Sequence, residues 1–314
     1  MQENQSQHVR LFFKNVVLGG SAACCTCFFT NPLDVVKIRM QLQGELKARG
    51  QHAKFYRNPM QAMYVIARTD GLVALQKGFI PALHYQFFMN GFRLGSYQMA
   101  VRSGLTKDKD GKVSLLLSIV YGAMSGSLGA LTGSPFYMVK VHLQAQAKQE
   151  IAVGHQHTHE NMRHAFKTVF KEQGGRGLYR GVNAAIPAVT VGSATQLSSF
   201  SFARDFLTRH QILQPDSLPL TLTSTCFSGV CLAVVFTPFD VVSTRLYNQG
   251  VSSTGTGLFY KGFFDCFYRI FQTEGILGFY KGIVPSFLRL VPHTILCLSF
   301  WDRFSLYFMK SSKQ

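Results

Sequence analysis

The segment PLDVVKIR at residues 32–39 recurs as PFYMVKVH at 135–142 and as PFDVVSTR at 238–245. The three copies are equally spaced, and each of them follows a long apolar stretch. A fixed internal period indicates one structural unit that is repeated along the chain. The period is too long for a stacked solenoid. We therefore expect three copies of a two-helix unit around a pseudo-threefold axis, with a path along that axis.

The composition favours a membrane protein. Charged residues make up only 15% of the chain, against about 25% in a typical soluble domain. The mean hydropathy is a modest +0.10, which suits helices that have one lipid-facing side and one polar side. A soluble helical protein with a large core is the alternative that composition leaves open.

The chain is strongly basic, with a formal net charge of +17. A compact basic patch would suggest a nucleic-acid partner, but here the Lys and Arg residues gather in the segments that follow the three motifs. An excess of Lys and Arg in loops on one side is the orientation signal of an inserted membrane protein. We therefore expect membrane lipids rather than nucleic acid as partners.

Each repeat contains the same order of expected helices. The first helices are expected at 12–42, 114–145 and 218–248. Short amphipathic helices are expected at 58–68, 161–172 and 262–273. The second helices are expected at 79–102, 182–208 and 283–309. Each long helix can cross a bilayer, which takes about 20 residues. The sequence thus predicts an all-α membrane protein of six transmembrane helices in three tandem repeats, at 1–105, 106–212 and 213–314.

Pro32, Pro135 and Pro238 fall inside the first helix of their repeats. Proline inside a helix removes a backbone hydrogen bond and kinks the chain. In a membrane, the carbonyl that is freed needs another partner. We expect these kinks to bend the three helices toward the axis and to close one end of the path.

Neither cysteine nor histidine spacing indicates a metal site or an enzyme. The seven cysteines lack ligand spacing, so we expect reduced thiols. His155, His157 and His159 alternate in a polar loop, which we expect to be solvated, with a chance metal site as the alternative. The sequence shows no nucleophile–base pair and no phosphate-binding glycine loop, so we expect no enzyme.

A second motif follows each copy of the first, as DGLVALQKG at 70–78, QGGRGLYRG at 173–181 and EGILGFYKG at 274–282. Together the two motifs resemble those of the mitochondrial carrier family over essentially the whole chain. The resemblance implies a monomeric, multi-pass solute carrier of the mitochondrial inner membrane, with its short helices on the matrix side.

Within that family the chain is similar to the oxaloacetate-carrier branch, which includes solute carrier family 25 members 34 and 35. The stretches that carry this similarity are Pro32–Glu45, Tyr85–Gly95, Ser134–Gln146, Ile151–Gln156 and Arg289–Leu296.

The resemblance implies a matrix gate in which the acid of one proline motif pairs with the base of another repeat. Asp34 is then expected to meet Lys140, and Asp240 to meet Lys37. The third pair is Tyr137 with Ser243, and the two have lost their charge together, which is consistent with pairing because a lone buried charge is costly. The expected gate residues, with two bracing glutamines, are Asp34, Lys37, Gln41, Tyr137, Lys140, Gln144, Asp240 and Ser243.

The resemblance also implies a cytosolic gate near the ends of the second helices. No complete ion pair survives there, so we expect this gate to close weakly and the resting protein to favour the outward-open state. The expected residues are Tyr97, Gln98, Phe200, Arg204, Trp301 and Asp302.

Three glycines open the second helices, where backbone N–H groups can bind anions. In the family such sites hold cardiolipin, so we expect this lipid but no cofactor. Plain capping turns are the alternative. The expected lipid-binding residues are Lys77, Gly78, Arg180, Gly181, Lys281 and Gly282.

Two arginines lie in the middle of the second helices, Arg93 and Arg289. Arginine is unfavourable at membrane depth and marks a functional site, and its guanidinium binds carboxylate, sulfate or phosphate. We expect a small anion, of the dicarboxylate, oxaloacetate, keto-acid or sulfate type that the branch implies. Ala188 stands where carboxylate carriers usually have an arginine, so one anchor is missing. The expected substrate-binding residues are Tyr85, Gln86, Asn90, Arg93, Ala188, Val189, Gln196, Arg289 and His293.

Other functions stay open at this point. Within transport, the chain is alternatively an uncoupling-type proton or anion leak, or a carrier of nucleotides or cofactors. Outside transport, the alternative is a membrane scaffold.

Overall fold

The computed structural model describes residues 2–47, 54–108, 111, 113–214, 217–252 and 256–311, and most of these residues are helical. The long helices in this part of the chain are α1 (Gln2–Leu42), α3 (Phe79–Arg102), α4 (Leu115–Ala145), α6 (Val182–Arg209), α7 (Leu218–Asn248) and α9 (Ile283–Ser311). The short helices are α2 (Pro59–Thr69), α5 (Met162–Gly177) and α8 (Phe263–Glu274). Single 3₁₀ turns lie at η1 (Leu72–Gln76), η2 (Gln149–Ile151) and η3 (Ile276–Tyr280).

The expected helices are confirmed, with some changes in their bounds. Helix α1 begins at Gln2 rather than at residue 12. Our prediction followed the apolar stretch, whereas Gln and Glu are good helix formers that extend the helix beyond it. The range of α5 includes Gly174, whose φ of 66° is not helical. The short amphipathic helix therefore ends before this glycine, and a turn follows, as η1 and η3 do in the other repeats.

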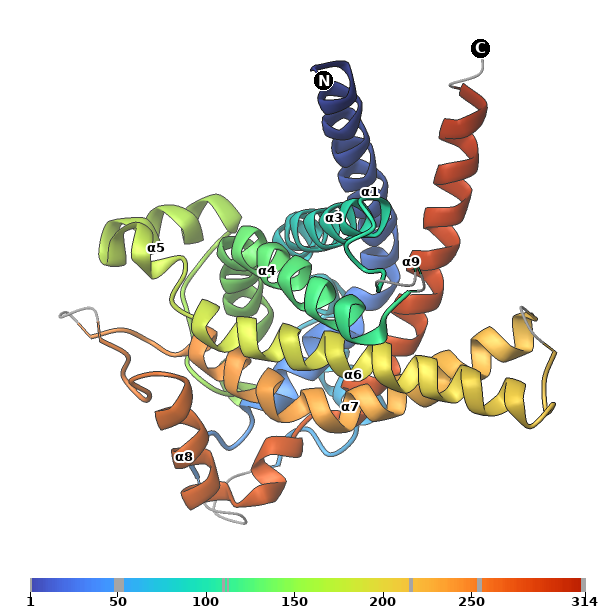
Figure 1. Ribbon diagram of the computed structural model, residues 1–314. Helices are drawn as coiled ribbons and strands as arrows, with labels where there is room; N and C mark the ends of the chain where they lie inside the picture. The colour runs from blue at the N-terminus through green and yellow to red at the C-terminus, as the bar shows by residue number, and fades with distance from the viewer. Residues whose placement is uncertain are drawn as a thin grey trace.

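The six long helices form a closed ring. In the order of the chain, α1 packs against α3, α3 against α4, α4 against α6, α6 against α7 and α7 against α9, and α9 returns to α1. The two chain ends lie on the same side of the molecule (Figure 1). We call the opposite end, where α1, α4 and α7 finish and α3, α6 and α9 begin, the gated end.

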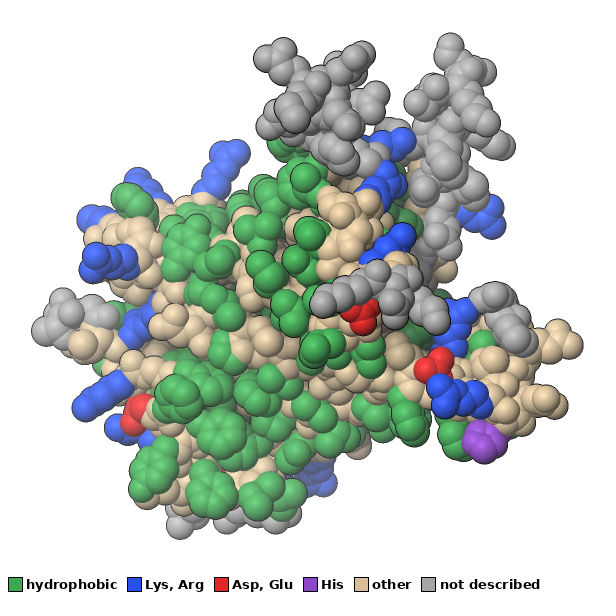
Figure 2. Space-filling model, viewed as in Figure 1, with side chains coloured by type: hydrophobic (Ala, Val, Ile, Leu, Met, Phe, Trp, Pro, Cys, Tyr) green, Lys and Arg blue, Asp and Glu red, His purple; other side chains and the backbone are tan. Residues whose placement is uncertain are grey.

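The outer surface is apolar over a wide area (Figure 2). Large hydrophobic side chains such as Leu116 and Met124 on α4 and Val230 on α7 are at least half exposed. Soluble monomers rarely expose such contiguous patches. Lys and Arg side chains lie around the margins of this surface in Figure 2. The ring therefore presents lipid-compatible walls.

Four segments of the described residues are long and apolar enough to cross a membrane: Phe12–Leu42, Leu115–Ala145, Pro219–Asn248 and Ile276–Trp301. Helices α3 and α6 are also long, but their hydropathy is lower. The reason is the polar side chains that they direct into the ring, described below. The mean hydropathy of a whole helix combines its apolar lipid-facing side with its polar cavity-facing side, and is therefore lower for α3 and α6.

Pro32 illustrates how the ring satisfies a carbonyl that a proline leaves without its helical donor. Because Pro32 has no N–H, the carbonyl of Phe28 lacks its helical donor. The side-chain amide of Gln76 in η1 donates to this oxygen at 3.3 Å, and Asn31 donates to the Gln76 side chain at 2.9 Å. The turn that follows the short helix thus stabilises α1 at Pro32, where a kink stays a prediction.

Glycines allow the helices to approach closely. A Cβ atom on Gly129 of α4 would lie 2.5 Å from the backbone oxygen of Met89 in α3. A Cβ atom on Gly91 of α3 would lie 2.8 Å from the backbone oxygen of Val16 in α1. These neighbours are backbone atoms, so a side chain at either glycine would force the helices apart.

We predict that Gly129→Ala lowers the free energy of unfolding by about 1–3 kcal/mol, the usual cost of overpacking. Thermal unfolding of the purified protein in detergent measures this effect. Gly122→Ala on the same helix is the control, because its added methyl group meets only the side-chain tip of Leu197, at 3.2 Å. Equal stability of the two variants would contradict the close α3–α4 contact.

Candidate functional site

Two buried ion pairs join three of the long helices at the gated end. The Lys140 ammonium of α4 lies 2.7 Å from Asp34 Oδ2 of α1, and the Lys37 ammonium of α1 lies 2.7 Å from Asp240 Oδ2 of α7. All four side chains are less than a tenth exposed. These are the two ion pairs that the sequence predicted; their role as a gate stays a prediction.

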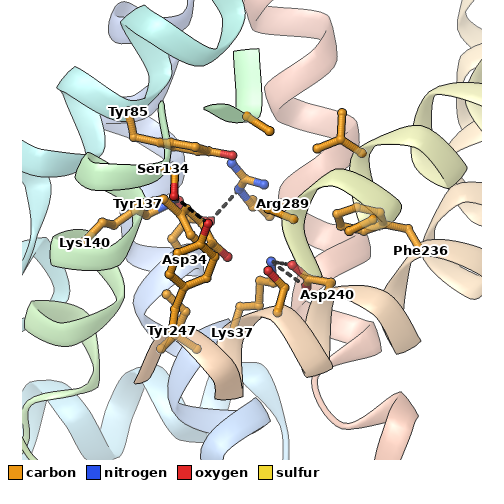
Figure 3. A pocket seen from close by; sticks show the side chains of 16 residues that line it. Asp34, Lys37, Tyr85, Ser134, Tyr137, Lys140, Phe236, Asp240, Tyr247 and Arg289 are labelled. Carbon is orange, nitrogen blue, oxygen red and sulfur yellow. Dashed lines mark hydrogen bonds and ion pairs between the residues drawn. The ribbon is translucent and has the colours of Figure 1, made fainter. Parts of the chain in front are cut away.

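Arg289 of α9 also reaches this cluster. Its Nε lies 2.5 Å from Asp34 Oδ1, in a contact that lacks hydrogen-bond geometry and is therefore an ion pair (Figure 3). Asp34 is thus shared by Lys140 and Arg289, one cation on each oxygen. The sequence placed Arg289 only among the substrate-binding residues. We call Asp34, Lys37, Lys140, Asp240 and Arg289 the gate cluster; it holds three positive and two negative side chains.

The expected pair of Tyr137 with Ser243 stays a prediction. Both side chains line the cavity at the gated end, but no hydrogen bond joins them in the part of the chain that the structure describes. The Tyr137 ring instead packs between those of Tyr85 and Tyr247, with ring centroids 4.8 and 5.0 Å away. A tyrosine ring can make these aromatic contacts, which an aspartate at this position could not. Its ring also lies 5.7 Å from the Lys140 ammonium, within cation–π range.

The two predicted bracing glutamines behave differently. The Gln41 amide donates to Asp240 at 2.7 Å, directly beside the Lys37 pair. The Gln144 amide donates to Asn31 at 2.8 Å instead of to the Asp34–Lys140 pair. The Gln144 side chain therefore links α4 to α1 without a hydrogen bond to the Asp34–Lys140 pair, which corrects our expectation for this residue.

A second layer of ion pairs lies beneath the gate cluster and was missed in the sequence. Arg39 pairs with Asp70 at 2.7 Å, and Arg245 pairs with Glu274 at 2.5 Å. Burial alone would raise the pKa of Glu274, but the hydrogen bonds and charge of Arg245 outweigh burial and lower it. Each pair joins the end of a proline motif to the acid of the second motif. The sequence contained a signal for these pairs. Repeats 1 and 3 have a base and an acid at the two positions, whereas repeat 2 has lost both together, with His142 and Gln173 in their place.

Above the gate cluster, a hydrogen-bond chain runs along α3. Gln86 donates to His293 Nε2 of α9 at 3.0 Å and accepts from Asn90 at 2.7 Å. Arg93 donates through Nη2 to Asn90 at 3.2 Å. The Arg93 Nε is buried and has no hydrogen-bond partner among the described residues. Four predicted substrate-binding residues thus form one connected row.

Three adjoining cavities contain the predicted substrate-binding residues. The first, of about 70 Å³, lies in the gate cluster and is lined by Tyr85, Ala188, Val189 and Arg289 among others. The second, of about 150 Å³, is lined by both arginines, and we call it the anion cavity. The third, of about 350 Å³, opens toward the chain termini, and we call it the outer cavity. The predicted residues that line the anion cavity are Tyr85, Gln86, Asn90, Arg93, Val189, Gln196, Arg289 and His293.

Among the described residues, no hydrogen bond or ion pair joins Tyr97, Gln98, Phe200 and Trp301 to one another. Tyr97 and Phe200 line the outer cavity, while the Trp301 ring faces Gly19 of α1. Gln98 is partly exposed and Arg204 is exposed. The side chain of Asp302 lies outside the described residues. The outer cavity, which is larger than the cavity in the gate cluster, therefore lies at the end where the sequence predicted no complete ion pair.

The predicted lipid-binding residues open α3, α6 and α9. Gly78 and Gly282 have left-handed backbones, with φ of 66° and 78°, whereas Gly181 is right-handed. Lys77 donates to the backbone oxygen of Gln146 at 3.2 Å. Lys281 pairs with Glu274 at 2.6 Å. Both lysines therefore already hold neighbouring loops, and a role for these positions in lipid binding stays a prediction.

Our expectation that the histidine loop is solvated is wrong. His159 is only 8% exposed, and His155 and His157 are partly buried. Burial lowers the pKa of His157 to about 3, so its ring is neutral near pH 7. The loop folds back onto His142 at the end of α4, with His142 and His157 ring centroids 3.5 Å apart. Nothing in the spacing of the sequence brings residue 142 to this loop.

We predict that Asp240→Asn lowers the free energy of unfolding by about 3–5 kcal/mol, because it leaves the buried Lys37 unpaired. Thermal unfolding in detergent measures this loss. The control is Asp265→Asn, because Asp265 pairs with Arg269 on the exposed side of α8. Exposed pairs contribute only about 0–1 kcal/mol. Similar losses in the two variants would contradict a buried gate cluster.

Comparisons with known proteins agree with this architecture. The sequence profile of the family described as mitochondrial carrier protein matches residues 9–108, 111–211 and 214–312. Solute carrier family 25 member 35 of Mus musculus is 49% identical over 297 residues, which cover 95% of this chain and 99% of that protein. The mitochondrial oxaloacetate transport protein of Saccharomyces cerevisiae is 40% identical over 297 residues, with 93% and 88% covered. The mitochondrial citrate transporter E of Aspergillus niger is 40% identical over 286 residues, with 90% and 89% covered.

The profile covers nearly the whole chain in three repeats, and the ring of six helices repeats the same unit three times. The function of such a chain is transport and not catalysis. The chain therefore belongs to the mitochondrial carrier family, whose members are multi-pass transport proteins of the mitochondrial inner membrane.

Proposed function

We propose that this carrier transports a small anion, of the oxaloacetate, dicarboxylate, keto-acid or sulfate type, by alternating access. The observation that carries the proposal is the anion cavity, which is lined by the two buried arginines Arg93 and Arg289. None of the described residues that line the anion cavity or the outer cavity is acidic. Arg93 has no acidic partner among the described residues, and an unneutralised cation at membrane depth calls for an anionic one.

The size and chemistry of the anion cavity support a small ligand. Its volume of about 150 Å³ lies below the roughly 300–1,000 Å³ typical of sites for drug-sized molecules. A nucleotide would therefore need the outer cavity as well. Gln86, Asn90 and Gln196 supply uncharged hydrogen-bonding groups for orientation. The relatives described above are named for oxaloacetate and citrate, and both are carboxylates.

The missing arginine at Ala188 narrows the choice further. Ala188 is 3% exposed and lines the gate-cluster cavity beside Val189. With two arginine anchors rather than three, we expect a preference for an anion with one or two negative groups over a tricarboxylate. Guanidinium groups bind carboxylates through paired hydrogen bonds, so each anchor suits one carboxylate.

Arg289 suggests how binding is coupled to gating. It lines the anion cavity and also pairs with Asp34 of the gate cluster. An anion that binds Arg289 competes with Asp34 for the same guanidinium. A ligand shifts a conformational equilibrium only through such a differential interaction. Binding would thus weaken the hold of α9 on α1 and favour opening of the gated end.

The weak cytosolic gate is part of the same proposal. The gate cluster lies at one end, and the outer cavity lies at the other. This arrangement supports the proposal of an outward-open resting state. We further propose a monomer with cardiolipin at the openings of α3, α6 and α9, since the ring of helices is closed within one chain.

We predict that Arg93→Ala and Arg289→Ala each lower the rate of oxaloacetate or sulfate uptake into proteoliposomes by about 10–100-fold, the loss expected for one charge-assisted hydrogen-bond partner. Arg102→Ala, at the exposed end of α3, is the control and should leave uptake unchanged. In thermal-shift measurements with each anion, we expect the two arginine variants to bind more weakly than Arg102→Ala and the unmodified protein.

The alternatives give different outcomes. A proton leak would show conductance without anion exchange. A nucleotide carrier would exchange nucleotides and not small anions. A scaffold would retain its full function in the Arg93→Ala/Arg289→Ala double variant, and any of these three results would overturn the proposal.

A further inference from the structure

We propose that His142, His157 and His159 bind one divalent transition-metal ion of the zinc class. His142 lies at the end of α4, and the other two lie in the loop that follows η2. One ring nitrogen from each of the three residues lies within 4.8 Å of the others. No acidic or thiol group is needed to complete a three-nitrogen site, which is a known donor set for zinc.

Hydrogen bonds already hold two of the rings in the tautomer that a metal requires. His142 Nε2 lies 2.8 Å from the backbone oxygen of Tyr247, and His157 Nε2 lies 2.8 Å from that of Asn248. A carbonyl oxygen only accepts, so both Nε2 atoms carry the proton. The lone pair of each ring is therefore on Nδ1. Histidine ligands of metals typically donate their second ring N–H to a backbone carbonyl in this way.

The spacing of the nitrogens suits a tetrahedral ion. His142 Nδ1 and His159 Nε2 lie 3.3 Å apart in a hydrogen bond, which His159 donates because the lone pair of His142 is on Nδ1. Two nitrogens at about 2.0–2.1 Å from zinc, separated by a tetrahedral angle, lie roughly 3.3–3.4 Å apart, so this spacing fits the ion once the His159 proton moves to Nδ1, which has no partner among the described residues. The His157 ring stacks on that of His142, with centroids 3.5 Å and planes 12° apart, so it has to turn to direct its nitrogen at the ion, and water would fill the fourth position.

The loop is positioned for this role before any ion binds. The Gln146 amide donates to the backbone oxygens of His157, at 2.5 Å, and of His159, at 3.0 Å. Asn248 donates to the backbone oxygen of His155 at 3.2 Å. A ligand loop that is held in place loses less conformational entropy on binding.

The position of His142 within its repeat gives a reason to expect a cation at this site. In repeats 1 and 3 the position of His142 is an arginine, Arg39 or Arg245, that pairs with Asp70 or Glu274. Repeat 2 has lost both charges, because the acid is replaced by Gln173. A bound ion would replace the missing ion pair as the cross-link at the end of α4. It would also strengthen the two hydrogen bonds to Tyr247 and Asn248 of α7, and so stabilise the closed gated end.

Imidazole nitrogens select the metal. They suit zinc, copper, nickel and iron, whereas magnesium and calcium prefer oxygen ligands. We therefore expect stoichiometric binding of Zn²⁺ and none of Mg²⁺.

Equilibrium dialysis of the purified full-length protein against ZnCl₂, with MgCl₂ as comparison, tests the site. We expect one Zn²⁺ per chain for the unmodified protein and for His155→Ala, which changes a histidine of the same loop outside the trio. We expect His157→Ala and His159→Ala to bind at least about 100-fold more weakly, because even the loss of a supporting residue costs 10–100-fold. His142 is fully buried, so its substitution is avoided.

A second readout guards against misfolded variants. Zn²⁺ should raise the unfolding temperature of the unmodified protein and of His155→Ala, and not that of His157→Ala, while all three unfold at similar temperatures without the ion. The proposal is overturned if the unmodified protein binds no stoichiometric zinc. It is equally overturned if His159→Ala binds zinc as tightly as His155→Ala, which would indicate sites elsewhere, such as the cysteines.

Discussion

The fold depends on how one buried carboxylate, that of Asp34, is shared. Lys140 of α4 and Arg289 of α9 each lie against one of its oxygens, and the residue is only 2% exposed. Removing one partner of a buried ion pair leaves a charge without compensation, which is strongly destabilising. Side chains from all three repeats therefore meet at Asp34 of α1. Because Arg289 also lines the anion cavity, gate and cavity are one electrostatic system, and a change of charge in either is felt in the other.

The pseudo-threefold symmetry is broken at one boundary, that between α4 and α7. In the upper layer, Tyr137 of α4 and Ser243 of α7 replace the acid and the base found elsewhere. In the lower layer, within repeat 2, His142 and Gln173 replace the base and the acid. Aromatic packing of Tyr137 on Tyr247 and the hydrogen bond from His142 to Tyr247 take the place of ion pairs there. Ion pairs join the helices at two boundaries of the gated end and uncharged contacts join them at the third, so the contacts that hold the helices together differ around the ring.

Much of this was predictable from the sequence because a threefold repeat tests every assignment three times. The helices and the pairs of Asp34 with Lys140 and of Asp240 with Lys37 all follow from the motif positions. What failed depends on side-chain reach and on loop paths, which have no period. Arg289 reaches Asp34, Tyr137 packs between Tyr85 and Tyr247, and Gln144 donates to Asn31. His142 meets His157 because Gln146 and Asn248 hold the loop, a set of hydrogen bonds that no spacing rule encodes.

The most direct test of the shared carboxylate is the anion affinity of two neutralised variants, Asp34→Asn and Lys140→Gln, measured with oxaloacetate and sulfate by thermal shift or calorimetry. Both substitutions break the same ion pair of the gate, but only Asp34→Asn releases Arg289. If the carboxylate competes with the anion, Asp34→Asn binds at least about tenfold more tightly than Lys140→Gln, a difference of about 1.4 kcal/mol. Equal affinities in the two variants would contradict the account, since Arg289 would then bind its anion without regard to Asp34.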